Sequence, residues 1–373
     1  MKQYIELVKK IKSEGILKGP ARKNMPNTLS LFGYQMRFNL QEGFPAITTK
    51  KLYWKGVVVE LLWFLRGDTN IKFLDKHGVK KMWHQDAYNY YEKLCNRDGL
   101  LDIFTFQEFQ ESIKNNTTRL ITLPKNYRLG DCGKQYGYQW RKIKKPTHSD
   151  IDDGSLYDNY EEIDQIKNVI HSLKTNPESR RHIVNSWNVL DIDNDDLALP
   201  PCHSFFQFNC RKLTLNERKE INEPGRLSWD ESQENDEYFN LLNIPQYYLD
   251  CNVYLRSGDV FLGIPIDIAS YALLTHIIAK ICNMVPGELI NSFGDVHIYE
   301  NHFEAVEKQL QNEPKKLPKL VIDSTESFNF QDNDIDWLIQ CLGDKVDIME
   351  TFKLENYEHC GKIEAELSTG MKN

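Results

Sequence analysis

Residues 199–207 read Leu-Pro-Pro-Cys-His-Ser-Phe-Phe-Gln, and this stretch sets a cysteine beside a histidine directly after two prolines. Proline fixes its φ angle and donates no hydrogen bond to a β ladder, so Cys202 is predicted to enter an extended segment from a rigid start. Phe205, Phe206 and Phe208 are expected to surround its thiol with apolar side chains. Cys202 is therefore a candidate nucleophile, and the alternative is an inert cysteine that only fills the core.

The segments on either side of this stretch indicate a mixture of strands and buried helices. Strands are expected at residues 28–39, 205–210 and 247–255. The apolar runs at 57–65 and 268–282 predict buried helices, and a first helical pattern ends at Gly15. No repeat or flexible Gly/Ser linker divides the chain, so we expect one α+β domain over residues 1–373. Polar segments near 86–130, 143–160 and 211–246 are expected to be irregular surface insertions.

Composition limits the class of protein. A hydrophobic content of 40%, with 18 Tyr and 18 Phe, is typical of a globular chain. The formal net charge of −8 argues against a nucleic-acid partner, because such proteins carry a basic surface. No apolar run approaches the roughly 18 residues of a membrane span, and the N-terminus has no signal-peptide block. We therefore expect a cytoplasmic protein without a membrane partner.

The eight cysteines include no CxxC pair and show no regular spacing. This pattern argues against a zinc site and against a disulfide framework. We expect reduced thiols and no bound metal.

Glu60 is the single ionisable residue in the apolar run at 57–65. A carboxyl in such surroundings must be paired, hydrogen-bonded or shifted in pKa. A carboxyl shifted toward neutrality suits general acid–base catalysis. The alternative is a structural acid held by a backbone or arginine partner.

Two arginine-bearing segments suggest an anion pocket. Arg180 and Arg181 precede the strand-like residues 182–185, and Arg256 with Ser257 follows another predicted strand. Guanidinium groups offer paired planar donors that match a phosphate. A solvated surface pair is the alternative for the doublet, but two such segments in one acidic chain favour a phosphate site.

His297 and Tyr299 alternate along a predicted extended segment, so their side chains point to one face. They could hydrogen-bond a sugar hydroxyl. Purely structural hydrogen bonding is the alternative.

Taken together, these segments resemble the thymidylate synthase family across most of the chain outside the insertions. The matching segments, in chain order, are residues 60–70, 136–141, 179–181, 199–203, 256–259, 268–276 and 294–299. So many ordered matches leave little room for chance. The resemblance implies a mixed β-sheet packed with helices and an obligate homodimer that uses one face of the sheet.

The resemblance also implies the chemistry. Cys202 would add to C6 of a pyrimidine nucleotide, which makes C5 a nucleophile toward the one-carbon unit of 5,10-methylenetetrahydrofolate. Glu60 would order water and move protons. A thiolate suits this step because it is strongly nucleophilic near neutral pH and can later leave by elimination; nearby arginines would favour the ionised form.

Further site residues follow from the same resemblance. They are Tyr136 near the catalytic cysteine; Trp83 and Asp259 at the folate; His203, Gln207, Arg256, Ser257 and Asp259 at the nucleotide; His297 and Tyr299 at the ribose; and Arg180 and Arg181 at the phosphate bound by the partner subunit.

One departure from the family bears on the base. Asp267 stands where thymidylate synthases carry an asparagine that reads the base. An amide can accept from uracil N3–H and donate to O4, whereas cytosine offers N3 as acceptor and N4 as donor. A carboxyl can accept from N4–H and share a proton with N3. Asp267 therefore fits dCMP better than dUMP, and the alternative is drift with an unchanged substrate.

Other departures point the same way. Aspartate at this position resembles deoxycytidylate hydroxymethylases, a branch of the family known from bacteriophages that modify cytosine. Lys23 matches a hydroxymethylase lysine where synthases carry arginine, although Arg22 could serve after a one-residue shift. Gln85 resembles the hydroxymethylase glutamine, and Leu255 replaces a glutamine usual in synthases.

The C-terminal tail departs as well. Residues 361–367 resemble the synthase tail that closes over folate, but the chain continues to Asn373 and displaces the terminal carboxylate. Altered closure would let water reach the exocyclic methylene intermediate.

The sequence thus predicts a dCMP hydroxymethylase, which converts dCMP, water and methylenetetrahydrofolate to 5-hydroxymethyl-dCMP and tetrahydrofolate. The resemblance implies a phage origin and the host cytoplasm. One alternative ends in hydride transfer and yields 5-methyl-dCMP, and another is ordinary methylation of dUMP to dTMP. A third is an inactive relative that binds nucleotide or RNA, against which the intact Cys202, Glu60 and arginine segments argue.

Overall fold

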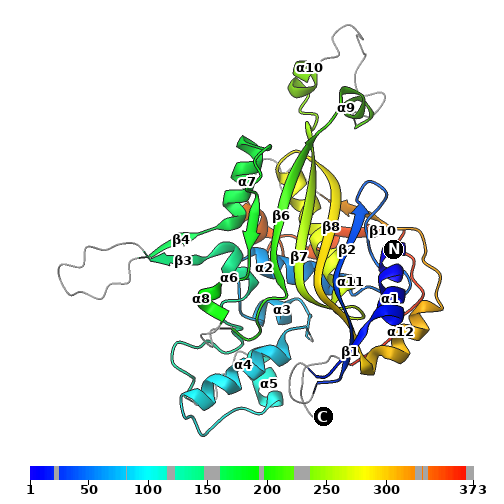
Figure 1. Cartoon of the computed structure of the whole chain (residues 1–373). Helices are drawn as coiled ribbons and strands as arrows, with labels where there is room; N and C mark the ends of the chain where they lie inside the picture. The colour runs from blue at the N-terminus through cyan, green and yellow to red at the C-terminus, as the bar shows by residue number, and fades with distance from the viewer. Residues whose placement is uncertain are drawn as a thin grey trace, which may run out of the picture.

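A six-stranded mixed β-sheet forms the centre of the computed structural model, which describes residues 1–20, 25–80, 82–115, 122–146, 160–192, 197–221, 236–323, 330 and 335–366. The strand order is β1-β2-β8-β7-β6-β5 (Figure 1). β7 and β8 run parallel, and the other neighbouring pairs are antiparallel. The strands are β1 (Ile16–Lys18), β2 (Thr28–Asn39), β5 (Ile183–Asn185), β6 (His203–Lys212), β7 (Tyr247–Asp259) and β8 (Val285–Tyr299).

The strand predictions agree with this sheet. β2 has the predicted bounds, and β6 and β7 contain the predicted runs at 205–210 and 247–255. Side chains alternate along β6, so Phe206 and Phe208 are buried while Phe205 is exposed. The expectation that all three rings surround Cys202 is wrong for Phe205, because its ring stacks on Tyr254 of β7 on the exposed face, with centroids 5.7 Å apart.

The buried helix α11 (Gly263–Ile281) packs on the other face of the sheet, against β7 and β8, and a second buried helix, α2 (Trp54–Leu65), packs on α11. α11 begins before the predicted residue 268, because Pro265 lies in its first turn, where a helix needs no N–H donor. By length and composition α11 could cross a membrane, so the expectation that no apolar run approaches that length is wrong. Most of its residues are buried between the sheet and α2, as in the core helix of a folded domain.

The remaining elements surround this core. They are α1 (Lys2–Glu14), α3 (Lys72–Lys76), α4 (His84–Arg97), α5 (Phe106–Asn115), α6 (Tyr136–Arg141), α7 (Gln165–Thr175), α8 (Val189–Ile192), α9 (Leu215–Ile221), α10 (Asp236–Leu241), the 3₁₀ helix η2 (Glu300–His302), α12 (Phe303–Leu310), α13 (Ile335–Cys341), α14 (Ile348–Thr351), and the strand pairs β3 (Ile143–Pro146) with β4 (Tyr160–Ile163) and β9 (Lys319–Ile322) with β10 (Phe352–Glu355).

The segment at 86–130 is not irregular, which corrects the prediction. Residues 86–97 belong to α4 and residues 106–115 form α5, and the two helices lie side by side below the sheet in Figure 1. Tyr88 and Tyr91 lie one turn apart on α4, and their rings contact the buried Phe109 of α5 at centroid distances of 5.5 and 5.4 Å. A few aromatic residues at helical spacing are enough to pack two otherwise polar helices.

The other two predicted insertions are also partly ordered. β3 and β4 pair at the base of the segment at 143–160, and residues 147–159 lie outside the described residues. In the segment at 211–246, the buried Arg218 of α9 donates to Asp236 at 2.7 Å and to Asn240 at 2.8 Å in α10. Residues 222–235 lie outside the described residues.

Arg141 connects the helix that carries Tyr136 to the rest of the core. Its buried guanidinium donates to Asp164 at 2.9 Å, to the carbonyl of Leu65 at the end of α2, and to Asp336 on α13. A buried charge of this kind is stable only while its partners are present. Arg141 therefore holds α2, α6 and α13 together.

We expect Arg141→Met to lower the free energy of unfolding by about 3 kcal/mol, because it leaves Asp164 and the Leu65 carbonyl without their donor. Urea denaturation followed by circular dichroism measures the change. The matched control is Lys142→Met, which removes a neighbouring exposed cation and should change stability by less than about 0.5 kcal/mol. Equal effects of the two substitutions would show that Arg141 does not connect these helices.

Candidate active site

Cys202 lies immediately before β6 and is held by its backbone. Its N–H donates to the hydroxyl of Tyr136 at 2.7 Å, and its carbonyl accepts from the backbone N–H of Arg256 at 2.9 Å. The guanidinium of Arg256 donates to the carbonyls of Pro200 and Pro201 at 2.8 and 2.7 Å. The proline turn is therefore fastened to the neighbouring strand β7, and the thiol is half-buried at the sheet's end.

A cation faces the sulfur of Cys202. A guanidinium nitrogen of Arg256 lies 4.0 Å from Sγ. A nearby positive charge favours the thiolate over the thiol, and the thiolate is the nucleophile. All eight cysteines lie in the described residues, and none of them forms a disulfide.

Tyr136, the first residue of α6, supports the cysteine segment. Its buried hydroxyl accepts from the N–H groups of Cys202 at 2.7 Å and His203 at 3.3 Å. Burial raises the pKa of Tyr136 well above its ordinary value, so the hydroxyl keeps its proton at neutral pH. It can therefore accept from the backbone and still donate a hydrogen bond.

Glu60 on α2 is both hydrogen-bonded and shifted in pKa. Its carboxylate accepts from the indole N–H of Trp83 at 2.6 Å. Burial raises the pKa of Glu60 from 4.5 to about 7, and the charge of Asp267 adds to the increase, while the bond from Trp83 and the proximity of His203 oppose it. A carboxyl that titrates near neutral pH can both release and take up a proton during a reaction.

Asp267 forms a hydrogen-bonded chain with two aromatic residues. Its Oδ1 lies 2.9 Å from Nε2 of His203, and Nδ1 of His203 lies 3.2 Å from the hydroxyl of Tyr271. Burial by itself would lower the pKa of His203, but the charge of Asp267, the bond to it and the charge of Glu60 raise it overall. Sequence reasoning missed Tyr271, although it follows Asp267 by one helical turn on α11 and so lies on the same side.

The ends of the parallel strands bring four more predicted residues together. Ser257 and Asp259 of β7 pair in register with Asp295 and His297 of β8. Asp259 accepts from the N–H of Phe261 at 2.9 Å and so also shapes the turn into α11. The rings of His297 and Tyr299 contact each other with centroids 4.9 Å apart, as expected for side chains on one face.

The arginine doublet lies apart from this group. Arg180 and Arg181 are exposed, just before the edge strand β5. Gln207 of β6 donates to the carbonyl of Arg180 at 3.1 Å, which orders the doublet's backbone. Gln85 is half-buried on α4 and donates to Asn89 at 2.9 Å. Leu255 is buried in β7, opposite His203.

Two parts of the predicted site lie outside the described residues. They are Lys23, with its neighbour Arg22, and the end of the tail from residue 367 to Asn373. The described ranges hold no group of three or more His, Cys, Asp or Glu that could bind a metal ion.

This arrangement suits nucleophilic catalysis with proton transfer. A thiol beside a guanidinium, a carboxyl with a pKa near 7 and a carboxylate–histidine pair meet where β6 begins and β7 ends. The thiol can add to an electron-poor carbon, and the carboxyl of Glu60 can move protons near neutral pH.

Comparison with known proteins shows which family has a similar sequence. A family model described as thymidylate synthase matches residues 2–369. The thymidylate synthase of Listeria innocua is 39% identical over 350 residues, which cover 90% of this chain and 95% of the relative. A thymidylate synthase of Listeria monocytogenes shows the same identity and coverage.

The raised pKa of Glu60 predicts a pH-dependent stability. Because the pKa rises from 4.5 to about 7 on folding, the folded chain keeps a proton that the unfolded chain releases. The stability from this proton is complete below pH 4.5 and is lost as the pH rises through about 7. Glu60→Gln keeps the shape of the side chain but removes its ionisation. The free energy of unfolding of this variant, relative to that of the unchanged protein, should therefore increase with pH by up to about 3 kcal/mol.

Urea denaturation of both proteins at several values between pH 5.5 and 8 measures this difference. Glu355→Gln, which changes an exposed glutamate, is the control and should shift stability by less than about 0.5 kcal/mol throughout. Parallel curves for Glu60→Gln and the unchanged protein would contradict the assignment.

Proposed function

The chain belongs to the thymidylate synthase family, and we propose that this member transfers the one-carbon unit of 5,10-methylenetetrahydrofolate to C5 of dCMP. The observation that carries the cytosine preference is the bond between Asp267 and His203. A carboxylate can only accept hydrogen bonds. It therefore suits the N4 amino group of cytosine and repels the O4 carbonyl of uracil.

The Asp267–His203 pair can also supply the proton that a hydrogen bond to cytosine N3 requires. In its neutral form N3 is an acceptor, so a proton must lie between N3 and the carboxylate. The charge of Asp267 and the hydrogen bond to it raise the pKa of His203, which favours a proton on the imidazole beside the carboxylate. The hydroxyl of Tyr271 contacts the other ring nitrogen and fixes the orientation of the imidazole. The pair can thus present a proton to N3 while Asp267 accepts from N4.

The reaction begins at Cys202. Its sulfur adds to C6 of the pyrimidine, and the electron pair moves to C5, which attacks the methylene carbon of the folate. Glu60, with a pKa of about 7, serves as the group that moves protons through ordered water. Loss of the C5 proton and departure of tetrahydrofolate leave an exocyclic methylene group on the ring.

We propose that water adds to this methylene, so that the product is 5-hydroxymethyl-dCMP after the sulfur leaves. Lys23, Gln85 and the chain beyond residue 367 depart from the synthase pattern and support this outcome. Hydride transfer from the folate would give 5-methyl-dCMP instead. The named relatives are thymidylate synthases, which makes dUMP methylation the second candidate for this chain.

One assay separates these functions. The enzyme is mixed with methylenetetrahydrofolate and either dCMP or dUMP, dihydrofolate is followed by absorbance, and the product is identified by mass. We expect a hydroxymethyl product from dCMP without dihydrofolate. Dihydrofolate formed in step with product would rule out hydroxymethylation, and a preference for dUMP would rule out the cytosine assignment. Absence of product with both bases would favour a relative that only binds nucleotide or RNA.

Asp267→Asn should lower kcat/KM for dCMP about 100-fold or more and raise it for dUMP, because an amide can donate to O4. The same assay with both nucleotides measures this change. Asp267→Ala is the control: it should lose dCMP turnover without gaining dUMP turnover. If alanine gained as much dUMP activity as asparagine, residue 267 would not read the base through hydrogen bonds.

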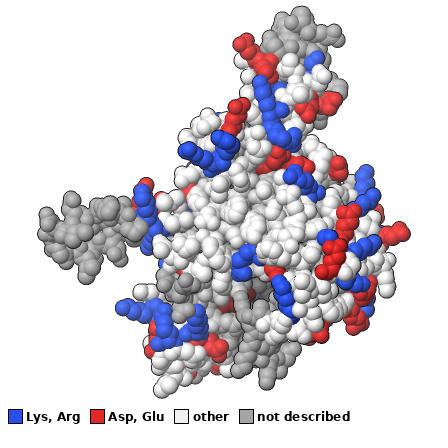
Figure 2. All heavy atoms as spheres, viewed as in Figure 1, with Lys and Arg blue, Asp and Glu red and all other residues white. Residues whose placement is uncertain are grey.

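We also propose a homodimer formed through the open face of the sheet. Figure 1 looks onto the face opposite α2 and α11, and Figure 2 shows few charged side chains across its middle. Apolar side chains on the strands are exposed, among them Phe32 at 78%, Ile183 at 45% and Phe205 at 38%. Arg180 and Arg181 lie exposed at the edge of this sheet, which supports their service in the partner's phosphate pocket.

Subunit mixing tests the shared site. Cys202→Ser and the double change Arg180→Ala with Arg181→Ala should each abolish or sharply reduce turnover. In a mixed dimer one site regains both an intact cysteine and intact arginines, so an equal mixture should recover roughly a quarter of the unmixed enzyme's activity. Cys202→Ser mixed with Glu60→Gln is the control and should recover nothing, since both groups serve their own subunit. Recovery in neither mixture would contradict a site shared between subunits.

A further inference from the structure

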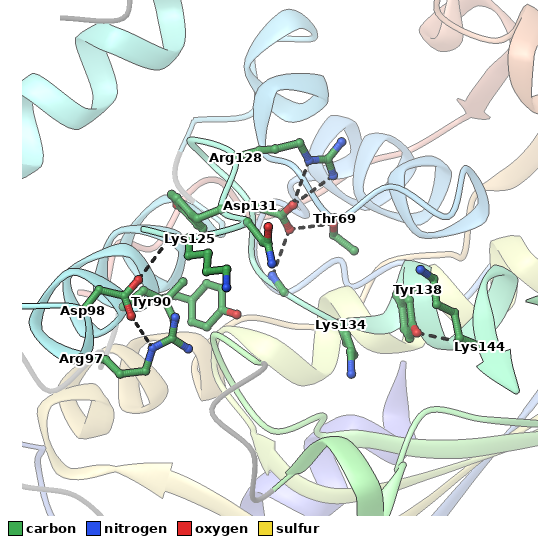
Figure 3. Close-up of a pocket in the computed structure, with 14 residues that line it drawn as sticks. Thr69, Tyr90, Arg97, Asp98, Lys125, Arg128, Asp131, Lys134, Tyr138 and Lys144 are labelled. Carbon is green, nitrogen blue, oxygen red and sulfur yellow. Dashed lines mark hydrogen bonds and ion pairs between the residues drawn. The ribbon is translucent and has the colours of Figure 1, made fainter. Parts of the chain in front are cut away.

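A cavity of about 990 Å³ lies between α4 and the segment that contains α6 (Figure 3). It is lined by Thr69, by residues of α4, by Lys125 to Arg128 with Asp131, and by Gly133, Lys134, Tyr138 and Lys144. Its volume is at the upper end of the range of roughly 300–1,000 Å³ for small-molecule sites. None of the residues that line it belongs to the active site described above.

The cavity is basic in an acidic protein. Five cationic side chains and two carboxylates line it, whereas the whole chain has a net charge of −8. Both carboxylates accept hydrogen bonds from other residues that line the cavity. Asp98 accepts from Arg97 at 2.8 Å and from the backbone N–H of Lys125 at 3.0 Å, and Asp131 accepts from Arg128 at 3.0 Å and from Thr69 at 2.7 Å.

The charge of the acids is therefore already balanced by wall residues. The hydrogen bond from Arg97 is the main cause that lowers the pKa of Asp98, so this carboxyl is ionised at neutral pH and stays bound to its partner. Lys134 pairs at 2.7 Å with Asp191, which lies outside the lining. Among the residues that line the cavity, cationic side chains outnumber carboxylates.

Cations and aromatic rings face each other across the cavity. In Figure 3, Arg97 and Lys125 lie on either side of the Tyr90 ring on one wall, and Lys134, Tyr138 and Lys144 occupy the other. Tyr90 packs on Tyr127 with centroids 6.1 Å apart, and Lys134 lies 5.9 Å from the ring of Tyr138. Lysine and arginine bind phosphate oxygens, and tyrosine faces stack on nucleobases without strong sequence preference.

We propose that this cavity binds a nucleoside triphosphate, with its phosphates against the lysines and arginines and its base against a tyrosine. A compact polyanion fits the local surplus of positive charge. A longer polynucleotide is disfavoured by the net charge of −8 on the whole chain. The site is separate from the pyrimidine site, so the proposal does not depend on which base the enzyme modifies.

Isothermal titration calorimetry on the full chain tests the proposal. The titrants are each of the four deoxynucleoside triphosphates, inorganic tripolyphosphate and a short single-stranded oligodeoxynucleotide, all in the presence of saturating dCMP or dUMP. We expect one nucleotide per chain. Lys125→Glu combined with Lys144→Glu reverses one charge on each wall and should weaken binding at least tenfold.

Two further variants control this measurement. Lys93→Glu combined with Lys114→Glu makes the same change in net charge on α4 and α5 outside the cavity and should leave binding unchanged. Tyr138→Leu should weaken the binding of the nucleotides at least fivefold and leave the binding of tripolyphosphate unchanged. Turnover should be retained in both lysine double variants, because neither touches the active site.

Four results would overturn the proposal. The first is equal nucleotide binding by the cavity double variant and the control double variant, and the second is displacement of the nucleotide by dCMP or dUMP. The third is tripolyphosphate that binds as tightly as any nucleotide. The fourth is an oligonucleotide that binds more tightly than the nucleotides and loses this binding in the cavity double variant. The last result would identify the cavity as a single-stranded nucleic-acid site.

Discussion

The parallel pairing of β7 with β8 is the constraint from which the site follows. Two parallel neighbours need a long crossover, and α11 supplies it by leaving the end of β7 and returning to the start of β8. The carboxyl ends of both strands then lie together next to the first turns of α11. Ligand sites in sheets with parallel strands form at such ends. Asp259, Asp267 and His297 are brought into one region by this connection alone.

The antiparallel strand β6 completes the region. Because it runs opposite to β7, its first residue His203 pairs with Leu255 near the end of β7. Cys202 therefore arrives beside Arg256, and the two prolines before it become acceptors for the same arginine. A nucleophile placed before a strand, and fastened by backbone bonds to Tyr136 and Arg256, has little freedom to move. The one-carbon chemistry of the family depends on such fixed placement of the thiol.

Burial and charge then set the protonation of the site. Glu60 lies on α2, which packs on α11, and the same burial that stabilises this helix pair raises its pKa to about 7. Asp267 increases that shift and at the same time raises the pKa of His203. The charge of Asp267 therefore acts on both Glu60 and His203, so an aspartate at this position favours the protonated form of each of these two neighbours.

The sequence by itself determined the family and the bounds of β2, and it indicated Cys202 as a candidate nucleophile and Glu60 as an unusual carboxyl, because local spacing and an acid in an apolar run are visible without a structure. It also identified Asp267, from the hydrogen bonds that a carboxyl can form. It misjudged residues 86–130, where a few aromatic residues outweigh many polar ones, and it misplaced Phe205, since strand alternation takes its ring to the open face. Only the tertiary structure decided that Asp267 binds His203, that Tyr271 supports this pair, and that a basic cavity lies between α4 and the segment that contains α6. These features join side chains from elements distant in the chain, and their contacts depend on how the elements pack.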